Sequence, residues 1–466
     1  MPLRHNLTFS ICRYIGMPIC RYNEEKKSKT LFLGFFLCKD EFFFACMQNL
    51  LYLCALLLAI RLMENYTTSI FIVAILFGLL DLLTDRWSAV QRQLFPILSC
   101  VLYFLCIITY YYGPDIQTYV PHYETIESLG EVWHKGGDNK FEIGYSLLCS
   151  LLHGLGWSYW WMTWTVKTLY FIALWLLLRT LPKRKIFALS CIVMTDTNLI
   201  MHEARQCLAV SFFVFMILLL QHKKYIWAVV CAVVTVFMHK SGFFPIGLTL
   251  CGMFLYRTRQ YAAIYTILTI ILLVLVVLPV QRISTSIMDV LPLPKTYIAS
   301  LSHHLSLGLQ FQTVAVIYLA LLLIFGIYLS YDSRRKYTWY AVMALCGMGV
   351  IVILYPYYFL LVRLRSYFVP FIVCYLVVLL SDASRTRAVP YGTMMKQALM
   401  MLVLVYYIHV AVGQERGAKL LQSPVYRGCT VFELTQASSR QIRNRQMQIA
   451  ASYWKNDYMQ RAKSTL

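Results

Sequence analysis

The stretch "HEARQCLAVSFFVFMILLL", residues 202–220, carries four polar side chains among its first five residues and then continues as an apolar run that only Ser211 interrupts. Another apolar run, "KIFALSCIVM" at 185–194, precedes it. Runs of this length and composition are typical of helices that cross a membrane. A charged group at membrane depth is costly and normally faces a cavity or a partner. The stretch therefore indicates a helical membrane protein. The role of Arg205 near the end of a span then needs an explanation.

The whole chain has the composition of a membrane protein. Of its 466 residues, 59% are hydrophobic and 14% are charged, which leaves too few polar side chains to cover a soluble protein. Long continuous apolar runs recur, whereas a β-barrel would show short alternating segments. The fifteen cysteines are scattered without a Cys-x-x-Cys pair, so neither a disulfide framework nor a metal site is expected. We expect an all-α, polytopic transmembrane helical bundle.

The apolar runs predict about 12 to 14 spans within a transmembrane domain over residues 47–412. A basic segment at 1–46, cytoplasmic or interfacial, precedes this domain, and a basic tail at 413–466 follows it. Residues 143–156 are apolar but too short to span comfortably, which favours a re-entrant or interfacial helix after a large outer loop. The predicted spans lie near 47–62, 67–83, 94–112, 160–180, 184–198, 200–221, 225–240, 242–256, 261–280, 312–330, 338–355, 361–381 and 394–412.

Charge orients these spans. The formal net charge is +21, and Lys and Arg concentrate in short connections such as "PKRK" at 182–185, as in cytoplasmic loops. No basic patch belongs to a soluble fold, so nucleic acid is not an expected partner. Outer loops are then expected near 113–142, which is acidic, and near 281–311. The span count puts the basic tail outside as well, but its charge favours an inside tail with residues 394–412 not fully spanning.

On this topology a set of polar side chains gathers on the non-cytoplasmic side. Asp196, Thr197 and Asn198 suit the turn and N-cap of the following helix, so Arg205 is expected about two turns into it. Carboxylates, a histidine and several cations at one face suggest a site for a charged substrate. The set is Asp115, Tyr119, Glu142, Tyr145, Arg205, Gln206, His239, Lys240, Arg363 and Arg365.

Most of these residues also have a purely structural interpretation. The two arginines of the late span, Arg363 and Arg365, could snorkel to the interface. His239 and Lys240 could be interfacial residues at a turn. Glu142 could stabilise the N-terminus of the next helix through its dipole. Arg205 is the hardest to explain in this way, because apolar sequence flanks it within a helix.

Several short motifs in this order resemble the EpsG family of Wzy-like polysaccharide polymerases. They are "GPDIQTY" at 113–119, "EIGY" at 142–145, "RQCLA" at 205–209, "HKS" at 239–241 and "RLRSYF" at 363–368. The resemblance covers roughly residues 94–380. The family often carries an Arg shortly before the first motif, where this chain has Tyr110, Tyr111 and Tyr112, and Pro114 stands where a small or β-branched residue is usual.

The resemblance implies a bacterial polymerase of the inner (cytoplasmic) membrane. It would transfer a growing undecaprenyl-diphosphate-linked glycan onto a new lipid-linked repeat unit, for capsule, exopolysaccharide or O-antigen synthesis. Cations would hold the diphosphate (Arg205, Arg363, Lys240, Gln206 and Arg365), tyrosines would contact the glycan (Tyr119, Tyr145), and the base would be His239, with Glu142 or Asp115 as alternatives. No cofactor or metal is implied. The implied partners are the lipid-linked oligosaccharide, membrane lipid, and a chain-length regulator and flippase of the same pathway.

Two alternatives stay open. Another polyprenyl-linked glycosyltransferase or a ligase would share this arrangement of residues, although an acidic pair is usual in its first outer loop, where this chain offers only Glu64. A lipid-linked oligosaccharide flippase should line a cavity at mid-membrane depth and carry repeat symmetry. Here the charges gather at one face and no repeat is apparent.

Overall fold

The computed structural model describes residues 66–83, 88–135, 141–258, 338–354, 358–381, 400, 403, 429–430 and 439–464. All of them belong to the larger of two compact units, Ile60–Leu466. Outside the described residues lie the basic segment 1–46, the outer loop near 281–311, the predicted spans near 47–62, 261–280 and 312–330, and nearly all of the one near 394–412.

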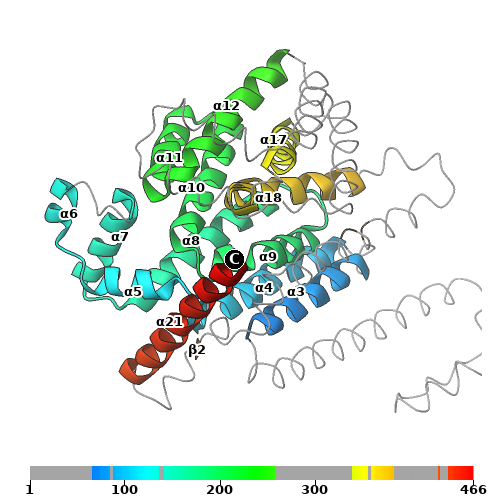
Figure 1. Ribbon diagram of the computed structural model, residues 1–466. Helices are drawn as coiled ribbons and strands as arrows, with labels where there is room; N and C mark the ends of the chain where they lie inside the picture. The colour runs from blue at the N-terminus through cyan, green and yellow to red at the C-terminus, as the bar shows by residue number, and fades with distance from the viewer. Residues whose placement is uncertain are drawn as a thin grey trace, which may run out of the picture. The chain divides into compact units, whose positions relative to one another are not determined.

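Helices make up almost all of the described chain (Figure 1). A short 3-10 turn, η1 (Lys240–Gly242), and two two-residue strands, β1 (Thr109–Tyr110) and β2 (Cys429–Thr430), are the other elements of the described residues. In chain order the helices are α3 (Tyr66–Leu83), α4 (Ser88–Ile107), α5 (Ile116–Glu124), α6 (Leu129–Lys135), α7 (Ile143–Gly154), α8 (Tyr159–Arg179), α9 (Lys185–Met201), α10 (Ala204–Gln221), α11 (Tyr225–Met238), α12 (Phe243–Thr258), α17 (Thr338–Leu354), α18 (Tyr358–Ser381) and α21 (Ser439–Ser464).

The predicted helical class is confirmed, and predicted spans within the described residues coincide with helices. Among the described residues, three helical segments are long and apolar enough to cross a membrane: Tyr159–Arg179, Ala204–Gln221 and Leu361–Val378. Further apolar helices are shorter, among them Ile143–Gly154, which was expected to be re-entrant or interfacial. These helices indicate a membrane protein, while the full number of spans remains a prediction.

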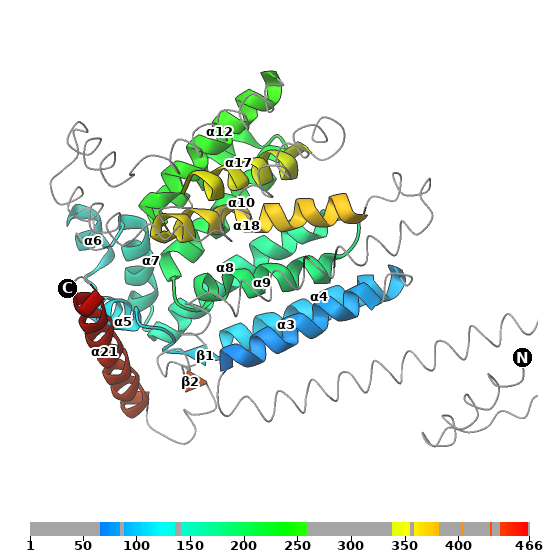
Figure 2. The same ribbon diagram turned by 45° about the vertical axis from the view of Figure 1, so that its right-hand side comes forward.

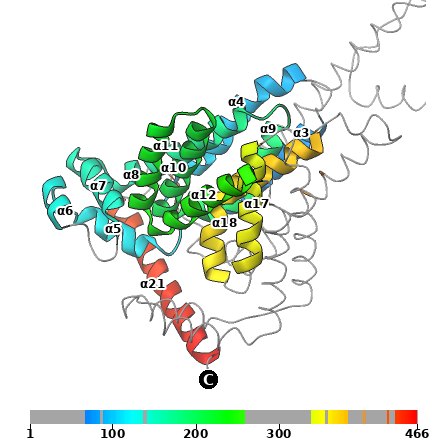
Figure 3. The same ribbon diagram turned by 90° about the horizontal axis from the view of Figure 1, so that it is seen from above.

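Helix α9 forms the centre of the packing. Nearly all its residues are buried, because the helix is apolar all round and must be enclosed by neighbours. It packs against α3, α4, α8 and α18, and Figure 2 shows α3, α4, α9 and α18 running side by side. The helix pairs α10 with α11 and α17 with α18 make further extensive contacts (Figure 3).

The connection between α9 and α10 differs from the prediction. Residues 195–198 do not form a turn, because α9 continues to Met201 with only a kink at Asp196. Two of their polar groups are hydrogen-bonded: Thr197 Oγ1 donates to the Val193 carbonyl at 2.6 Å, and the Tyr170 hydroxyl of α8 donates to Asp196 Oδ2 at 2.8 Å. The break falls at residues 202–203, so Arg205 is the second residue of α10 rather than two turns into it.

The basic tail lies against the 113–142 loop. Strand β2 pairs antiparallel with β1, with Thr430 opposite Thr109, and α21 packs on α5. The Gln117 amide donates to the Met447 carbonyl at 3.3 Å, and Arg443 forms an ion pair with Glu124. The tail therefore lies on the same side as this loop. This contact contradicts the preference for a tail on the side opposite to the loop, while the side of the membrane on which both lie stays a prediction.

Candidate functional site

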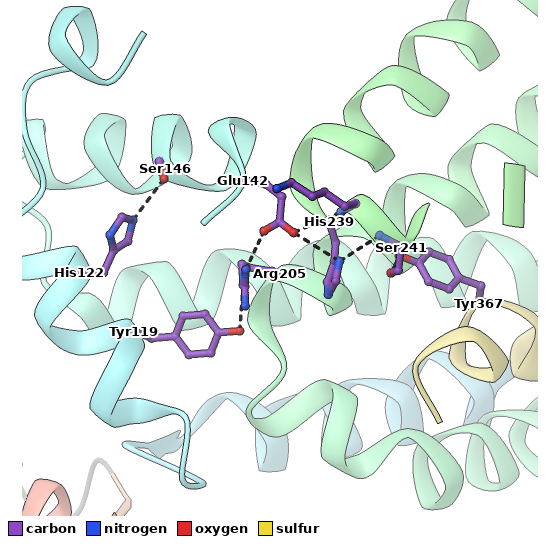
Figure 4. Close-up of polar contacts among 9 residues, drawn as sticks. Tyr119, His122, Glu142, Ser146, Arg205, His239, Ser241 and Tyr367 are labelled. Atoms are coloured by element: carbon purple, nitrogen blue, oxygen red, sulfur yellow. Dashed lines mark hydrogen bonds and ion pairs between the residues drawn. The ribbon is translucent and has the colours of Figure 1, made fainter. Parts of the chain in front are cut away.

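Glu142 is the centre of a polar cluster between three helices. It is the N-cap residue of α7, yet its side chain makes no capping hydrogen bond. Instead Oε2 accepts from Nη1 of Arg205 at 2.7 Å, and Oε1 accepts from the backbone N–H of Lys240 at 3.2 Å. Figure 4 shows the carboxylate between Arg205 and His239. Glu142 therefore stands at the N-terminus of its own helix, as the dipole interpretation expects, and its carboxylate also joins α7 to α10 and η1.

Charge keeps this carboxylate ionised. Burial alone would raise the pKa of Glu142, but the positive charge of Arg205 and the hydrogen bond from Arg205 bring it below its usual value. The side chain is 8% exposed. An ionised carboxylate that is buried and already hydrogen-bonded on both oxygens is a good anchor and a poor proton acceptor.

Gly144 makes the approach of α7 to α11 possible. A Cβ at this position would lie 2.8 Å from the backbone oxygen and from the Cβ of Phe237. Since Phe237 is followed closely by the turn of His239 and Lys240, the absence of a side chain at Gly144 lets Glu142 reach that turn.

Arg205 stands at the start of α10, where its charge is unfavourable. The first turn of a helix carries a partial positive charge from its unpaired N–H groups and favours anions. Nη1 is held by Glu142, and Nε donates to the Tyr119 hydroxyl at 3.3 Å. The guanidinium also lies over the Phe141 ring, 4.9 Å from its centroid. These contacts fix the plane of the guanidinium, whose side chain remains 24% exposed.

His239 ends α11 and contacts both its neighbours in the cluster. Its Nδ1 accepts a hydrogen bond from the Ser241 backbone N–H at 3.2 Å and lies 3.6 Å from Glu142 Oε1. Burial lowers the pKa of His239 from 6.5 to about 4, against the opposing effect of Glu142. His239 is therefore neutral near pH 7, and because Nδ1 accepts, its proton resides on Nε2.

A second histidine–carboxylate pair lies at the break between α9 and α10. Nδ1 of His202 is 3.6 Å from Oδ2 of Asp115, the N-cap residue of α5. Burial would raise the pKa of Asp115, but the neighbouring His202 and the charges of Arg205 and Arg363 hold it below the ordinary value. Asp115 therefore stays ionised, with a side chain that is 36% exposed.

Arg363 joins the cluster from α18. Its charge acts on Asp115, and its backbone carbonyl accepts from the buried Gln206 amide at 2.5 Å. The cluster thus gathers two carboxylates, two histidines and two arginines from five segments of the chain, with Lys240 at the adjoining turn.

The sequence model of the EpsG family matches residues 93–420, which span the cluster. The chain belongs to the EpsG family. This is a family of glycosyltransferase-like polysaccharide polymerases. No curated protein and no solved structure matches the chain significantly.

The geometry of this EpsG family member gives three of the predicted site residues a different setting. Tyr145 is fully buried and packs edge-on against Tyr119 at 5.6 Å between ring centroids, which favours support of Tyr119 over contact with a glycan. Gln206 is 3% exposed and positions Arg363. Residues two apart on a helix point in nearly opposite directions. Arg365 therefore points away from the side of Arg363, and it interacts electrostatically with buried Asp196.

His202 was not among the site residues predicted from the sequence. Its signal was present, since His202 precedes Arg205 by three residues in a polar stretch, but the helix break was expected earlier. A second omission is Tyr367, whose hydroxyl is 3.0 Å from that of Ser241. Within the part of the chain that the structure describes, no group of three or more His, Cys, Asp or Glu side chains could hold a metal ion.

Proposed function

We propose that this protein is a bacterial polysaccharide polymerase acting on the non-cytoplasmic side of the inner membrane. It transfers a growing undecaprenyl-diphosphate-linked glycan onto the sugar of a new lipid-linked repeat unit. The product serves a capsule, an exopolysaccharide or an O-antigen. The observation that carries this proposal is the placement of Arg205 and Arg363 beside Asp115 and Glu142, in a chain of the EpsG family.

Each group of the cluster suits one requirement of this reaction. The diphosphate leaving group gains negative charge as the glycosidic bond forms, and guanidinium groups stabilise such charge through bidentate hydrogen bonds. Arg205, which Glu142 and Tyr119 hold in place, and Arg363 would bind it, with Lys240 at the adjoining turn. Tyr119 would face the glycan. A proton acceptor for the attacking hydroxyl would come from a histidine–carboxylate pair.

The test replaces Arg205 with Ala and with Lys in the native host. Protein level is followed by blot and the length of lipid-linked glycan by gel. Both variants should accumulate single repeat units at unchanged protein level. The Lys variant should regain little elongation activity relative to the Ala variant, because an ammonium group cannot reproduce the planar fork of donors of a guanidinium group. His222→Gln, at the opposite end of α10, serves as the control and should keep the wild-type chain length.

Three other outcomes would contradict this proposal. Long polymer in Arg205→Ala would show that Arg205 does not bind substrate. Loss of even single units from the outer side, with units retained inside, would indicate a flippase for lipid-linked oligosaccharide. Chains of normal length that fail to reach a final acceptor would indicate a ligase.

A further inference from the structure

The two histidines of the cluster present opposite protonation patterns. At His239, Nδ1 accepts from the Ser241 backbone N–H at 3.2 Å. A backbone N–H can only donate, so the remaining nitrogen, Nε2, carries the proton of the neutral ring. A neutral His239 is therefore a hydrogen-bond donor at Nε2 and has no lone pair there to accept a proton.

His202 is set up in the reverse way. Its Nδ1 faces the Asp115 carboxylate at 3.6 Å. An imidazole beside a carboxylate holds its proton on the nitrogen that faces the carboxylate, unless an N–H donor occupies that nitrogen, as the Ser241 N–H does at His239. At His202 this arrangement makes Nε2 the proton acceptor. A distance of this size is usual for such pairs without substrate, because catalytic hydrogen bonds tighten in the reacting complex.

The turn before α5 is shaped around His202. Gly113 has a φ of +82°, and a Cβ there would lie 2.7 Å from the Cβ of His202. The ring of Tyr112 stacks on the His202 ring at 6.3 Å between centroids. Tyr111 also has a positive φ, 49°, which is uncommon for a residue other than glycine and is typical of functional sites. The strained turn thus brings Asp115 and His202 together.

We propose that His202, oriented by Asp115, takes the proton from the attacking sugar hydroxyl, while His239 donates a hydrogen bond through Nε2. This inference rests on the proposed function. The hydroxyl proton goes to Nε2 of His202, and the hydroxyl oxygen forms the new bond to the anomeric carbon. The bond from that carbon to the diphosphate oxygen breaks, and its electron pair leaves on the diphosphate between Arg205 and Arg363. His239 is then a donor to the same reacting groups and not the base.

The surroundings of His202 are polar and charged on several sides. Asp115 faces it from the start of α5, and Glu203 and Arg205 follow it in the chain. A small cavity of about 20 Å³, enough for about one water molecule, adjoins it and is lined by Tyr111, Tyr119, Tyr159, Thr163 and Lys167. Lys167 is directed at carbonyl oxygens, donating to those of Cys106 at 2.7 Å and Thr109 at 3.2 Å.

The pH dependence of elongation tests whether His239 is the base. A base must lose its proton to work, so the rate falls on acidification through the range in which the base titrates. The pKa of His239 lies at about 4, and those of Asp115 and Glu142 lie below their ordinary values. An acid limb at distinctly higher pH would therefore belong to none of these three groups.

The experiment measures initial rates of elongation by the purified full-length protein, with lipid-linked repeat units as substrate, between about pH 4 and pH 8. His202→Gln should lower the maximal rate about 100-fold or more and leave KM nearly unchanged. His239→Gln should alter both the rate and KM and keep the acid limb. His222→Gln should match the wild type throughout.

Asp115→Asn and Asp115→Glu keep the test decisive if His202→Gln does not fold, because the Asp115 side chain is 36% exposed. Asn should lower the rate, and Glu should restore part of it. A rate within about threefold of the wild type in His202→Gln or in Asp115→Asn would overturn the proposal. So would an acid limb near pH 4 that only His239→Gln removes. A wild-type protein that builds no polymer would instead overturn the proposed function itself.

Discussion

Gly144→Ala should damage the cluster without touching any of its side chains. The new Cβ would lie 2.8 Å from the backbone oxygen and from the Cβ of Phe237, and ordinary contact begins at 3.4 Å. Because part of the obstacle is backbone, no side-chain rotation relieves it. The start of α7 must therefore move away from α11 by roughly 0.6 Å, at a cost of about 1–3 kcal/mol in stability, as for other overpacked sites.

This displacement acts on Glu142, two residues earlier. Its hydrogen bond from the Lys240 N–H is already 3.2 Å long, so a shift of this size takes it beyond hydrogen-bonding distance. The contact with Arg205, at 2.7 Å, would lengthen with it. Because misplacing a catalytic group by about 1 Å costs on the order of 100-fold in rate, we expect a loss of about tenfold.

The assay compares lipid-linked glycan length and protein level in cells that carry Gly144→Ala or Gly154→Ala. Gly154 ends the same helix, and a Cβ there meets nothing within 4 Å, so this variant controls for any general effect of alanine in α7. Gly144→Ala should give shorter chains and Gly154→Ala wild-type chains. Equal chain lengths in the two variants would refute the argument that close approach of α7 to α11 positions Glu142.

Two further predictions concern the histidines. Gly113→Ala should reduce elongation and lower stability by about 1–2 kcal/mol, because a left-handed conformation disfavours a side chain and the Cβ would meet His202; Gly130→Ala, with open space around it, should do neither. For pH, the pKa of His239 in the folded protein is about 4, below its ordinary value of 6.5, so the unfolded chain binds the proton first on acidification. The melting temperature of the purified protein should therefore fall between about pH 6.5 and pH 4, and this part of the fall should be absent from His239→Gln.

The helices could be predicted closely because their signal is local. Residues 160–180 were predicted as a span and form α8 at Tyr159–Arg179, since a continuous apolar run determines where such a helix begins and ends. The helix break at residues 202–203 was missed because the polar groups of Thr197 and Asp196 are satisfied by bonds that propensity does not reveal. The docking of α21 on α5 was missed for a different reason. Its hydrogen bond joins Gln117 to Met447, two residues that are far apart in the sequence, and neither segment carries an apolar pattern that would predict the contact.

The sequence placed most of the site's residues on one side but could not assign their partners. Arg205 and Glu142 are 63 residues apart, and only the packing of α7 against α11 brings them into contact. Gln206 illustrates the limit. It was predicted to bind the diphosphate beside Arg205, yet its amide reaches the Arg363 carbonyl, a backbone atom of another helix that no sequence pattern identifies.

The cations of the cluster are paired with carboxylates, and under the proposed function this pairing affects the rate of turnover. A site made only of Arg205, Arg363 and Lys240 would bind a diphosphate tightly before and after the reaction, and such uniform binding does not raise the maximal rate. Glu142 and Asp115 offset part of that positive charge while keeping the guanidinium groups in place. Binding of the leaving group is then strongest when its charge develops between fixed donors, and the spent undecaprenyl diphosphate can dissociate. By this reasoning Glu142→Gln should slow product release as well as the chemical step, which single-turnover and steady-state rates of elongation would separate.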